Sequence, residues 1–360
     1  MLSRIERLRL RMTEHGVTIL LVTKWEHVLY LSGFSGSSGA LIVSADHAFL
    51  VSDFRYVLQA DQEAPDWTFI QAEHSLFMTI AETLASLTPT AVAFEPDSLS
   101  VTHYQQLVDE SRKASYTLQA APGLIESLRL TKEPEELACI REAVRITDEA
   151  YHHLTRLAKP GVTEEDLALE AEWYMRRHGA EGVAFSLIVA AGEHSALPHA
   201  QPGPRALQPG DLVVVDMGAR YAHYCADMTR TFAVAETTPI AREIYHICAL
   251  AQRAGVQNIK PGMSGHQADT IVRDIIERAE YGEYFGHGTG HGVGLEIHES
   301  PRISRHTDAI LPTGAVVTVE PGIYLPDVGG VRIEDLTVLT DGGLEILTQA
   351  AKPEELPVFG

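Results

Sequence analysis

The sequence predicts an α/β domain followed by an α+β domain that carries the chemistry. The chain has 360 residues, and at roughly 150 residues per domain this length corresponds to two units. Residues 17–120 alternate strand-like apolar runs with helical runs. After residue 180 strand-like runs dominate, and several contain a carboxylate. We expect the boundary between residues 120 and 134.

The first elements follow from apolar spacing. Ile5, Leu8 and Met12 recur at helical intervals, so the chain begins with an amphipathic helix. A second helix is expected at about residues 76–87. The runs on either side of it in this domain are VTILLVT, GALIVS, HAFLVSD, FRYVLQA and TAVAFEP.

The linker leads into the helices of the second domain. Pro134 lies at the start of a long helix, where its missing N–H costs nothing. Thr163 and Asp166 form an approximate capping box, and Gly179 is suited to end that second helix. Two further helices are expected near 239–255 and 264–280. We therefore assign the first domain to 1–122, the linker to 123–134 and the second domain to 135–360.

Composition limits the partners. Hydrophobic residues make up 45% and charged residues 21%, as in folded globular chains. Lys and Arg total 28 against 49 Asp and Glu, giving a net charge of −21. This field repels nucleic acid and anionic membrane surfaces, and neither is an expected partner. The acidity is dispersed, which indicates a solvated surface.

Three cysteines and the amino end indicate the compartment. Cys139, Cys225 and Cys248 are odd in number and lack CxxC spacing, which argues against a disulfide framework and a thiolate zinc site. No apolar run approaches the roughly 18 residues of a membrane span. The first sixteen residues carry charges throughout, where a signal peptide has an apolar core. We expect a cytoplasmic protein.

Carboxylates inside apolar strands are the most informative feature. Asp216 closes LVVVD, Asp227 opens DMTRTF, Glu320 ends AVVTVE and Glu334 lies in VRIEDL. Burying an ionised carboxylate without a partner is costly. If the strands of Asp216 and Asp227 form a hairpin, the four side chains can converge, and they cannot all ionise without a cation. The number of acidic oxygens suggests two ions that share bridging carboxylates.

A glycine-rich segment supplies nitrogen ligands. The run FGHGTGHGVGLEIH contains His287, His291 and His298, and its glycines permit sharp turns and close approach to an ion. Imidazole combined with carboxylates suits manganese, zinc, cobalt or iron better than calcium.

The order Asp, Asp, His, Glu, Glu resembles that of the pita-bread metallopeptidases, which comprise methionine aminopeptidase, aminopeptidase P and prolidase. All five positions are filled, unlike those of creatinase and the non-catalytic members. FSGSSGALIVS, SDFRY and LRLTKEPEEL resemble the extra N-terminal domain and linker of prolidases and aminopeptidases P, which methionine aminopeptidase lacks. The resemblance implies a pita-bread (creatinase/aminopeptidase-like) catalytic domain preceded by a smaller α/β creatinase-like domain.

The resemblance also implies a role for each metal-site residue. Asp227 and Glu334 would bridge two divalent ions, Asp216 would hold one ion, and His291 with Glu320 would complete the other. A water between the ions becomes the nucleophile. Glu320 is also the expected proton shuttle. Manganese is the expected metal, with zinc, cobalt or iron as alternatives.

Five further residues are expected around the substrate. His199 would contact substrate, His298 would stabilise the oxyanion, and His287 would face the leaving proline. Arg332 would anchor a substrate or ligand carboxylate, or simply pair with a neighbouring one. Arg55 either caps a substrate carboxylate in a neighbouring subunit or forms a structural salt bridge.

The expected activity is that of an Xaa-Pro dipeptidase (prolidase) acting on small peptides with proline in second position. Aminopeptidase P, which removes the first residue of longer Xaa-Pro peptides, is the alternative, because loops and neighbouring subunits decide between them. A non-catalytic pita-bread binding protein is a third possibility. The family implies a homodimer.

Overall fold

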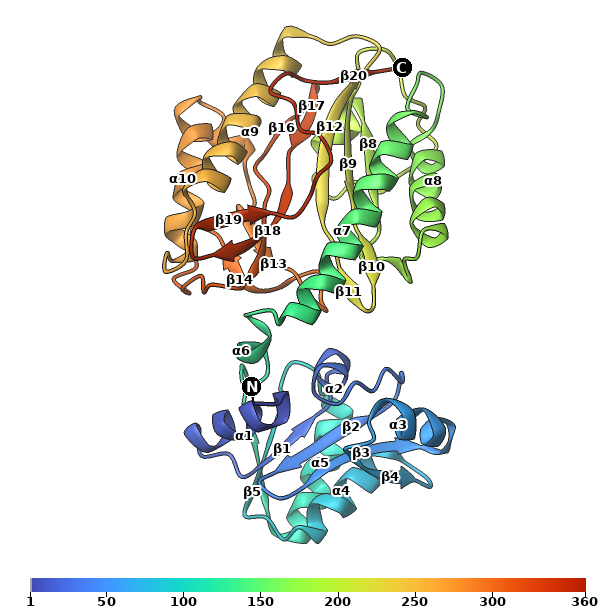
Figure 1. Cartoon of the computed structure of the whole chain (residues 1–360), viewed down its shortest axis with the longest axis vertical. Helices are drawn as coiled ribbons and strands as arrows, with labels where there is room; N and C mark the ends of the chain where they lie inside the picture. Colours follow the sequence, from blue (N-terminus) through green and yellow to red (C-terminus); the bar gives the residue numbers. More distant parts are fainter. Residues whose placement is uncertain (1) are drawn as a thin grey trace. The chain divides into compact units, whose positions relative to one another are not determined.

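The computed structural model describes residues 2–360. The chain separates into two compact units, Met1–Arg129 and Leu130–Gly360, and Figure 1 shows the elements of each. The first unit is α/β and the second α+β, which confirms the fold class expected from the sequence.

The described residues of the first unit form one six-stranded sheet. Across the sheet the strands are β4 (Thr68–Ala72), β3 (Ala48–Asp53), β2 (Ala40–Ser44), β1 (Ile19–Val22), β5 (Ala91–Phe94) and β6 (Thr117–Ala120). The β1–β2 and β2–β3 pairs are antiparallel, and the outer pairs are parallel. Apolar residues of β1, β2, β3 and β5 form the core with α4 (Leu76–Ser86).

Helices cover this sheet. Besides α4, they are α1 (Arg4–Glu14), α2 (Trp25–Ser32), α3 (Val57–Glu63) and α5 (Val101–Ala114). A capping box between Ser3 and Glu6 begins α1, which buries Leu8 and Met12 as its spacing predicts. The run FRYVLQA forms a 3₁₀ turn that continues into α3. A short helix, α6 (Glu126–Arg129), ends the unit.

Two sheets of the second unit position the site. In the described residues, one is four-stranded, with the order β20 (Val358–Phe359), β12 (Met228–Val234), β9 (Leu212–Met217) and β8 (Ile188–Ala191). The other is five-stranded, with the order β14 (Glu299–Ile303), β13 (Gly290–Gly292), β15 (Val316–Val319), β18 (Asp335–Thr340) and β19 (Gly343–Ile346). Smaller ladders join β11 (Tyr224–Cys225), β10 (Ala219–Tyr221) and β7 (Gly182–Val183), and β16 (Gly322–Leu325) with β17 (Gly329–Arg332).

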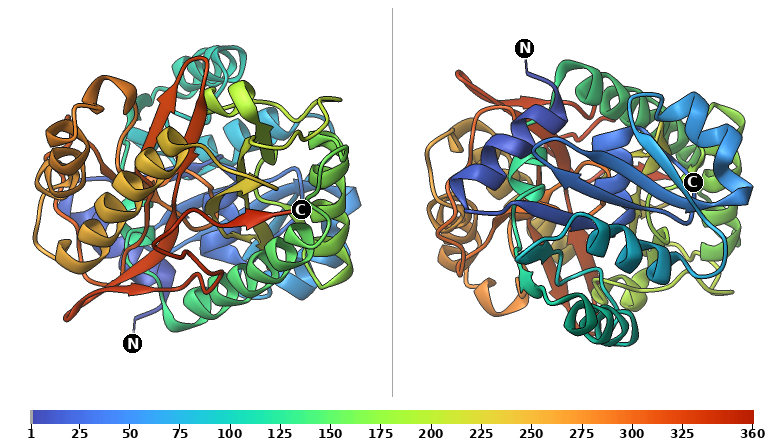
Figure 2. Two further views of the ribbon diagram at one scale, coloured as in Figure 1. Left: turned by 90° about the horizontal axis from the view of Figure 1, so that it is seen from above. Right: turned by 90° about the horizontal axis from the view of Figure 1, so that it is seen from below.

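Four long helices flank these sheets, namely α7 (Pro134–Thr155), α8 (Glu164–Arg177), α9 (Pro239–Asn258) and α10 (Gly265–Arg278). In Figures 1 and 2, α9 and α10 lie on one side of the strands and α7 and α8 on the other. Pro134 occupies the first turn of α7, and the Thr163 side chain accepts from the Asp166 amide to cap α8. Gly179 follows the end of α8 with φ 107°, a conformation that favours glycine.

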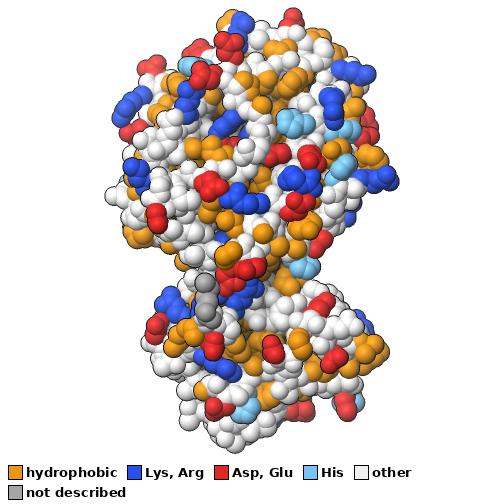
Figure 3. Space-filling model, in the orientation of Figure 1, with side chains coloured by type: hydrophobic (Ala, Val, Ile, Leu, Met, Phe, Trp, Pro, Cys, Tyr) orange, Lys and Arg blue, Asp and Glu red, His pale blue; other side chains and the backbone are white. Residues whose placement is uncertain are grey.

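The surface agrees with the composition. On the face of the second unit seen in Figure 3, acidic side chains are interspersed with basic ones. Within residues 2–360, none of the helices combines the length and apolar character needed to cross a membrane.

Candidate active site

Two antiparallel strand pairs bring the four carboxylates together. β9 pairs with β12 so that Asp216 lies opposite Thr229, and Asp227 directly precedes β12. The hairpin expected from the sequence is therefore present. β15 pairs with β18 in a register that places Val319 opposite Asp335, so Glu320 and Glu334 lie next to each other at the strand ends.

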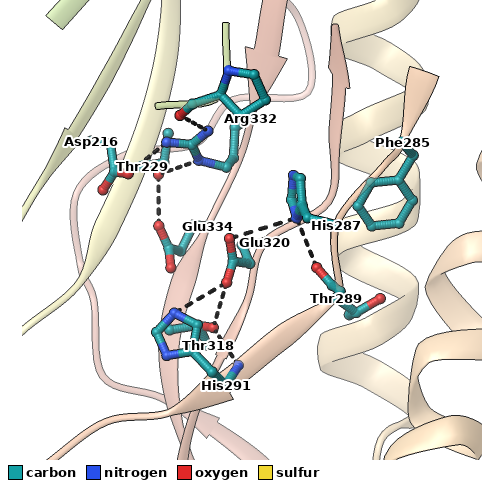
Figure 4. A network of polar contacts seen from close by, with 12 residues as sticks. Asp216, Thr229, Phe285, His287, Thr289, His291, Thr318, Glu320, Arg332 and Glu334 are labelled. Atoms are coloured by element: carbon teal, nitrogen blue, oxygen red, sulfur yellow. Dashed lines mark hydrogen bonds and ion pairs between the residues drawn. The ribbon is translucent and has the colours of Figure 1, made fainter. Parts of the chain in front are cut away.

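These acidic groups converge on His291. Asp227, His291 and Glu334 are buried, and each offers a ligand atom within 4.8 Å of the others. His291 Nε2 lies 3.3 Å from Glu320 Oε1 and 3.5 Å from Asp227 Oδ2. Figure 4 shows Asp216, Glu320, Glu334 and His291 around one space. All five residues of the expected metal set therefore lie together.

The electrostatics of this cluster fit divalent cations. Burial and the neighbouring carboxylates raise the pKa of Asp227 and of Glu334 well above the usual range. Burial raises the pKa of Glu320 to about 7. Asp216 Oδ1 is buried and meets no donor among the described residues. A cation would remove the repulsion and supply the missing partner.

His291 has the protonation that a ligand needs. Burial lowers the pKa of His291 to about 3, so the ring is neutral. Its Nδ1 lies 3.1 Å from the Gly292 carbonyl oxygen, which can only accept, so Nδ1 carries the proton. The lone pair of Nε2 therefore faces the carboxylates.

The Arg332 guanidinium donates hydrogen bonds to other residues of the site. Nη2 donates to Asp216 Oδ2 at 2.5 Å, Nε to Thr229 Oγ1 at 3.0 Å and Nη1 to the Tyr324 hydroxyl at 2.8 Å. Thr229 Oγ1 in turn donates to Glu334 Oε2 at 2.6 Å. Of the two interpretations of Arg332, this geometry favours anchoring of the acidic ligands over contact with substrate.

His287 is held by a hydrogen-bond chain. Its Nδ1 lies 2.8 Å from the Gly288 carbonyl oxygen, which makes Nδ1 the donor, and Nε2 lies 2.9 Å from the Tyr324 hydroxyl. Burial raises the pKa of Tyr324 to about 12 and lowers that of His287 to about 4. The phenol is therefore protonated and donates to the neutral imidazole. Both ring nitrogens of His287 are occupied.

A cavity of about 570 Å³ opens onto the cluster. His199 and His298 line it, and neither makes a hydrogen bond or ion pair with another described residue. The His298 ring meets that of His291 edge to face, with centroids 4.3 Å apart. Burial lowers the pKa of His298. These two histidines are thus available to a molecule in the cavity.

Sequence reasoning missed Arg302. It lies on β14, lines the cavity and is exposed. No acidic side chain within residues 2–360 pairs with it. The signal that could have found it is its position four residues after His298, in the same segment.

Sequence reasoning also missed Glu164, which organises the loop carrying His199. The Glu164 carboxylate is fully buried. It accepts from the amides of Ala191 at 2.8 Å and Gly203 at 3.1 Å, on the two sides of that loop, and contacts His194 Nδ1 at 2.9 Å.

Arg55 belongs to the first unit. Its Nε and Nη2 donate to the two carboxylate oxygens of Asp53, at 2.9 and 2.8 Å, and this pairing lowers the pKa of Asp53. The salt bridge is one of the two roles expected for Arg55. The cap over a neighbouring subunit's site stays a prediction.

Comparison with known proteins agrees with this geometry. The model of metallopeptidase family M24 matches residues 138–341, and that of the creatinase/prolidase N-terminal domain matches residues 4–131. The uncharacterized peptidase YqhT of Bacillus subtilis is 42% identical over 99% of this chain and 100% of that protein.

Two solved structures share the whole fold. The Xaa-Pro dipeptidase from Bacillus anthracis is 40% identical, with a TM-score of 0.94 over 99% of each chain. The X-Pro aminopeptidase from Thermotoga maritima is 34% identical, with a TM-score of 0.90 over 99% of this chain and 100% of that one. In chain order, a creatinase-type N-terminal domain is followed by a pita-bread catalytic domain. The chain therefore belongs to metallopeptidase family M24, as an enzyme of the prolidase and aminopeptidase P branch.

Proposed function

We propose that this enzyme is an Xaa-Pro dipeptidase, which hydrolyses the bond before a C-terminal proline. The observation that carries the proposal is Arg302, an unpaired guanidinium in the cavity beside the acidic cluster. A dipeptide brings a free carboxylate within a few atoms of the scissile bond, and a guanidinium binds carboxylates in a bidentate manner. A longer peptide has an uncharged amide at that point, so an aminopeptidase gains little from Arg302.

We also propose that the five converging residues form a metal site. Asp216, Asp227, His291, Glu320 and Glu334 would hold two divalent cations. Manganese is proposed, since carboxylate oxygens outnumber the single imidazole, and zinc, cobalt or iron remain alternatives. Such a pair of cations supplies polarisation of the scissile carbonyl and a water of lowered pKa.

Glu320 is the proposed proton carrier. Its Oε1 accepts from Thr318 Oγ1 at 3.0 Å, which leaves Oε2 to take a proton from water and pass it to the leaving proline nitrogen. The same Oε1 lies 3.3 Å from His291 Nε2, so the carboxylate is beside the other expected ligands.

The three histidines of the site that are not expected metal ligands would have different roles. His199 and His298, with uncommitted ring nitrogens, would donate to substrate oxygen atoms as charge develops. His287 has no hydrogen-bonding atom to offer, so it would present a ring surface to the leaving side. A proline ring is apolar and lacks an N–H, and such a surface suits it.

We also propose a substrate class, a cellular compartment and an oligomeric state. The substrates would be small peptides with proline in second position. Three unpaired cysteines support a reducing, cytoplasmic compartment. The homodimer, with Arg55 near a neighbouring site, rests on the family resemblance.

The test uses metal-stripped enzyme resupplied separately with Mn²⁺, Zn²⁺ or Co²⁺. Ala-Pro, its C-terminal amide and an Ala-Pro-Yaa tripeptide are compared. We expect Ala-Pro to be cleaved with the highest kcat/KM. Arg302→Ala should raise KM for Ala-Pro about 10- to 100-fold, because a hydrogen bond to a charged group contributes about 1.5–3 kcal/mol. The amide should be affected much less.

Arg305→Ala is the matched control, because Arg305 lies on the same segment and contacts Glu277 instead. It should leave KM unchanged. Preferred cleavage of the tripeptide, together with no effect of Arg302→Ala, would assign the enzyme to aminopeptidase P. Failure to cleave any of the three substrates with any metal would favour the non-catalytic alternative.

A further inference from the structure

Helix α10 carries two Asp–Arg pairs of identical spacing in different surroundings. Asp274 and Arg278 form an exposed i,i+4 pair, with side chains 43% and 78% exposed. Asp269 and Arg273 form a buried one, with side chains 1% and 7% exposed. Burying two charges carries a desolvation penalty that good geometry must offset. The buried pair is therefore expected to have hydrogen-bond partners that offset this penalty.

Those partners are backbone groups of one short segment. Arg273 contacts Asp269 through Nε at 2.7 Å and Nη2 at 3.0 Å. Its Nη1 donates to the Phe285 carbonyl at 2.9 Å and its Nη2 to the His287 carbonyl at 2.6 Å. Asp269 Oδ1 accepts from the Thr289 amide at 3.1 Å and from its hydroxyl at 2.8 Å. The pair thus binds three alternate residues, 285, 287 and 289.

An aromatic contact also joins Arg273 to this segment. The Arg273 guanidinium lies over the Phe285 ring, 4.1 Å from the centroid, an arrangement that attracts a cation to the ring face. The Phe285 ring in turn meets that of His287 edge to face, and Figure 4 shows both beside Thr289.

The segment held in this way leads directly into the metal cluster. The Thr289 carbonyl accepts from the Glu320 amide at 2.8 Å. Two residues later, the His291 amide donates to Thr318 Oγ1 at 3.0 Å. Gly290 lies between them with no free space, because a Cβ there would be 2.0 Å from the Thr318 carbonyl oxygen. A shift of Thr289 would therefore displace both Glu320 and His291.

We propose that Asp269 and Arg273 are positioning residues of the active site. Neither lines the cavity, and neither side chain is hydrogen-bonded to one of the five expected metal ligands. They act by fixing the backbone that sets His287, His291 and Glu320. The inference rests on the ligand set given under the proposed function. It assigns a role in catalysis to a helix on the outer side of the sheet.

The test substitutes each member of both pairs conservatively. Arg273→Lys keeps the charge but not the planar fork that reaches several acceptors, and Asp269→Asn removes the charge while keeping an acceptor. Mn²⁺ affinity of the metal-stripped protein, and kcat and KM for the best substrate, are measured at a temperature at which circular dichroism shows a folded protein. We expect kcat and Mn²⁺ affinity each to fall about 10- to 100-fold, as for residues that orient metal ligands, with a smaller change in KM.

Asp274→Asn and Arg278→Lys are matched controls and should stay within twofold of the wild type. Buried variants that lose thermal stability but keep kcat and Mn²⁺ affinity within twofold would overturn the proposal. If neither variant folds, Thr289→Val removes only the hydroxyl bond to Asp269, and it should lower kcat several-fold. An unchanged kcat in Thr289→Val would also overturn it. Mn²⁺ affinity needs no substrate, so a wrong assignment of dipeptidase activity leaves this test intact.

Discussion

The metal-free enzyme should become more stable when one of its expected metal ligands is neutralised. The Glu320 side chain is only 15% exposed, and this partial burial raises its pKa in the folded chain from 4.5 to about 7. At a pH above both values, ionised Glu320 destabilises the folded state. The pKa difference of about 2.5 corresponds to roughly 3 kcal/mol, at about 1.36 kcal/mol per pKa unit.

The sign depends on pH. Between pH 4.5 and 7 the folded state binds more protons at Glu320 than the unfolded state does, so stability falls as pH rises. At pH 5 less than about 1 kcal/mol of this loss is present, and at pH 8 nearly all of it is. Glu320→Gln removes the loss. The partly buried His287 and the buried His291 contribute with the opposite sign at acid pH, but they do so in both proteins and largely cancel.

The assay is urea unfolding of chelator-treated wild type and Glu320→Gln at pH 5 and pH 8. The variant should be more stable than wild type, and its advantage should be about 2–3 kcal/mol larger at pH 8. Saturating Mn²⁺ should reverse the order, because a ligand stabilises only the state that binds it. A variant that is no more stable than metal-free wild type at either pH would refute the reasoning.

Three other outcomes are expected. Tyr324→Phe removes the hydroxyl that accepts from Arg332 Nη1 and donates to His287 Nε2, so kcat/KM should fall about tenfold, at about 1–3 kcal/mol per unsatisfied buried group; an unchanged value would contradict the hydrogen-bond chain. Gly290→Ala forces a Cβ against Thr318, and calorimetric titration should show no Mn²⁺ binding. Mn²⁺ affinity of the wild type should rise from pH 6 to 8, because site carboxyls must lose protons to bind a cation; a flat profile would argue against their raised pKa values.

Much of the ligand set could be read from the sequence because its members break local rules. A carboxylate in an apolar strand, such as Asp216 in LVVVD, is an anomaly that does not depend on distant contacts. Strand pairing across a turn then places Asp216 and Asp227 together. The helices were also predictable, because capping residues such as Thr163 act within one turn.

The tertiary structure decided how the other side chains are used. The sequence left open whether Arg332 binds substrate or a ligand carboxylate, and the bond to Asp216 Oδ2 comes from a strand 116 residues away. His287 lies beside the ligands as expected, but Tyr324 occupies its Nε2. Neither fact has a local signal, because each depends on which groups two separate strands bring within hydrogen-bond reach.

The sequence by itself determined the fold class and the chemical character of the site, since residue type and periodicity encode both. It did not reveal Arg302 as an uncommitted cation or separate the two Asp–Arg pairs of α10, which have the same spacing and opposite burial. Burial and hydrogen bonding are properties of the packed chain. Only the assembled sheets and helices decide which charges face solvent and which hold the active site in place.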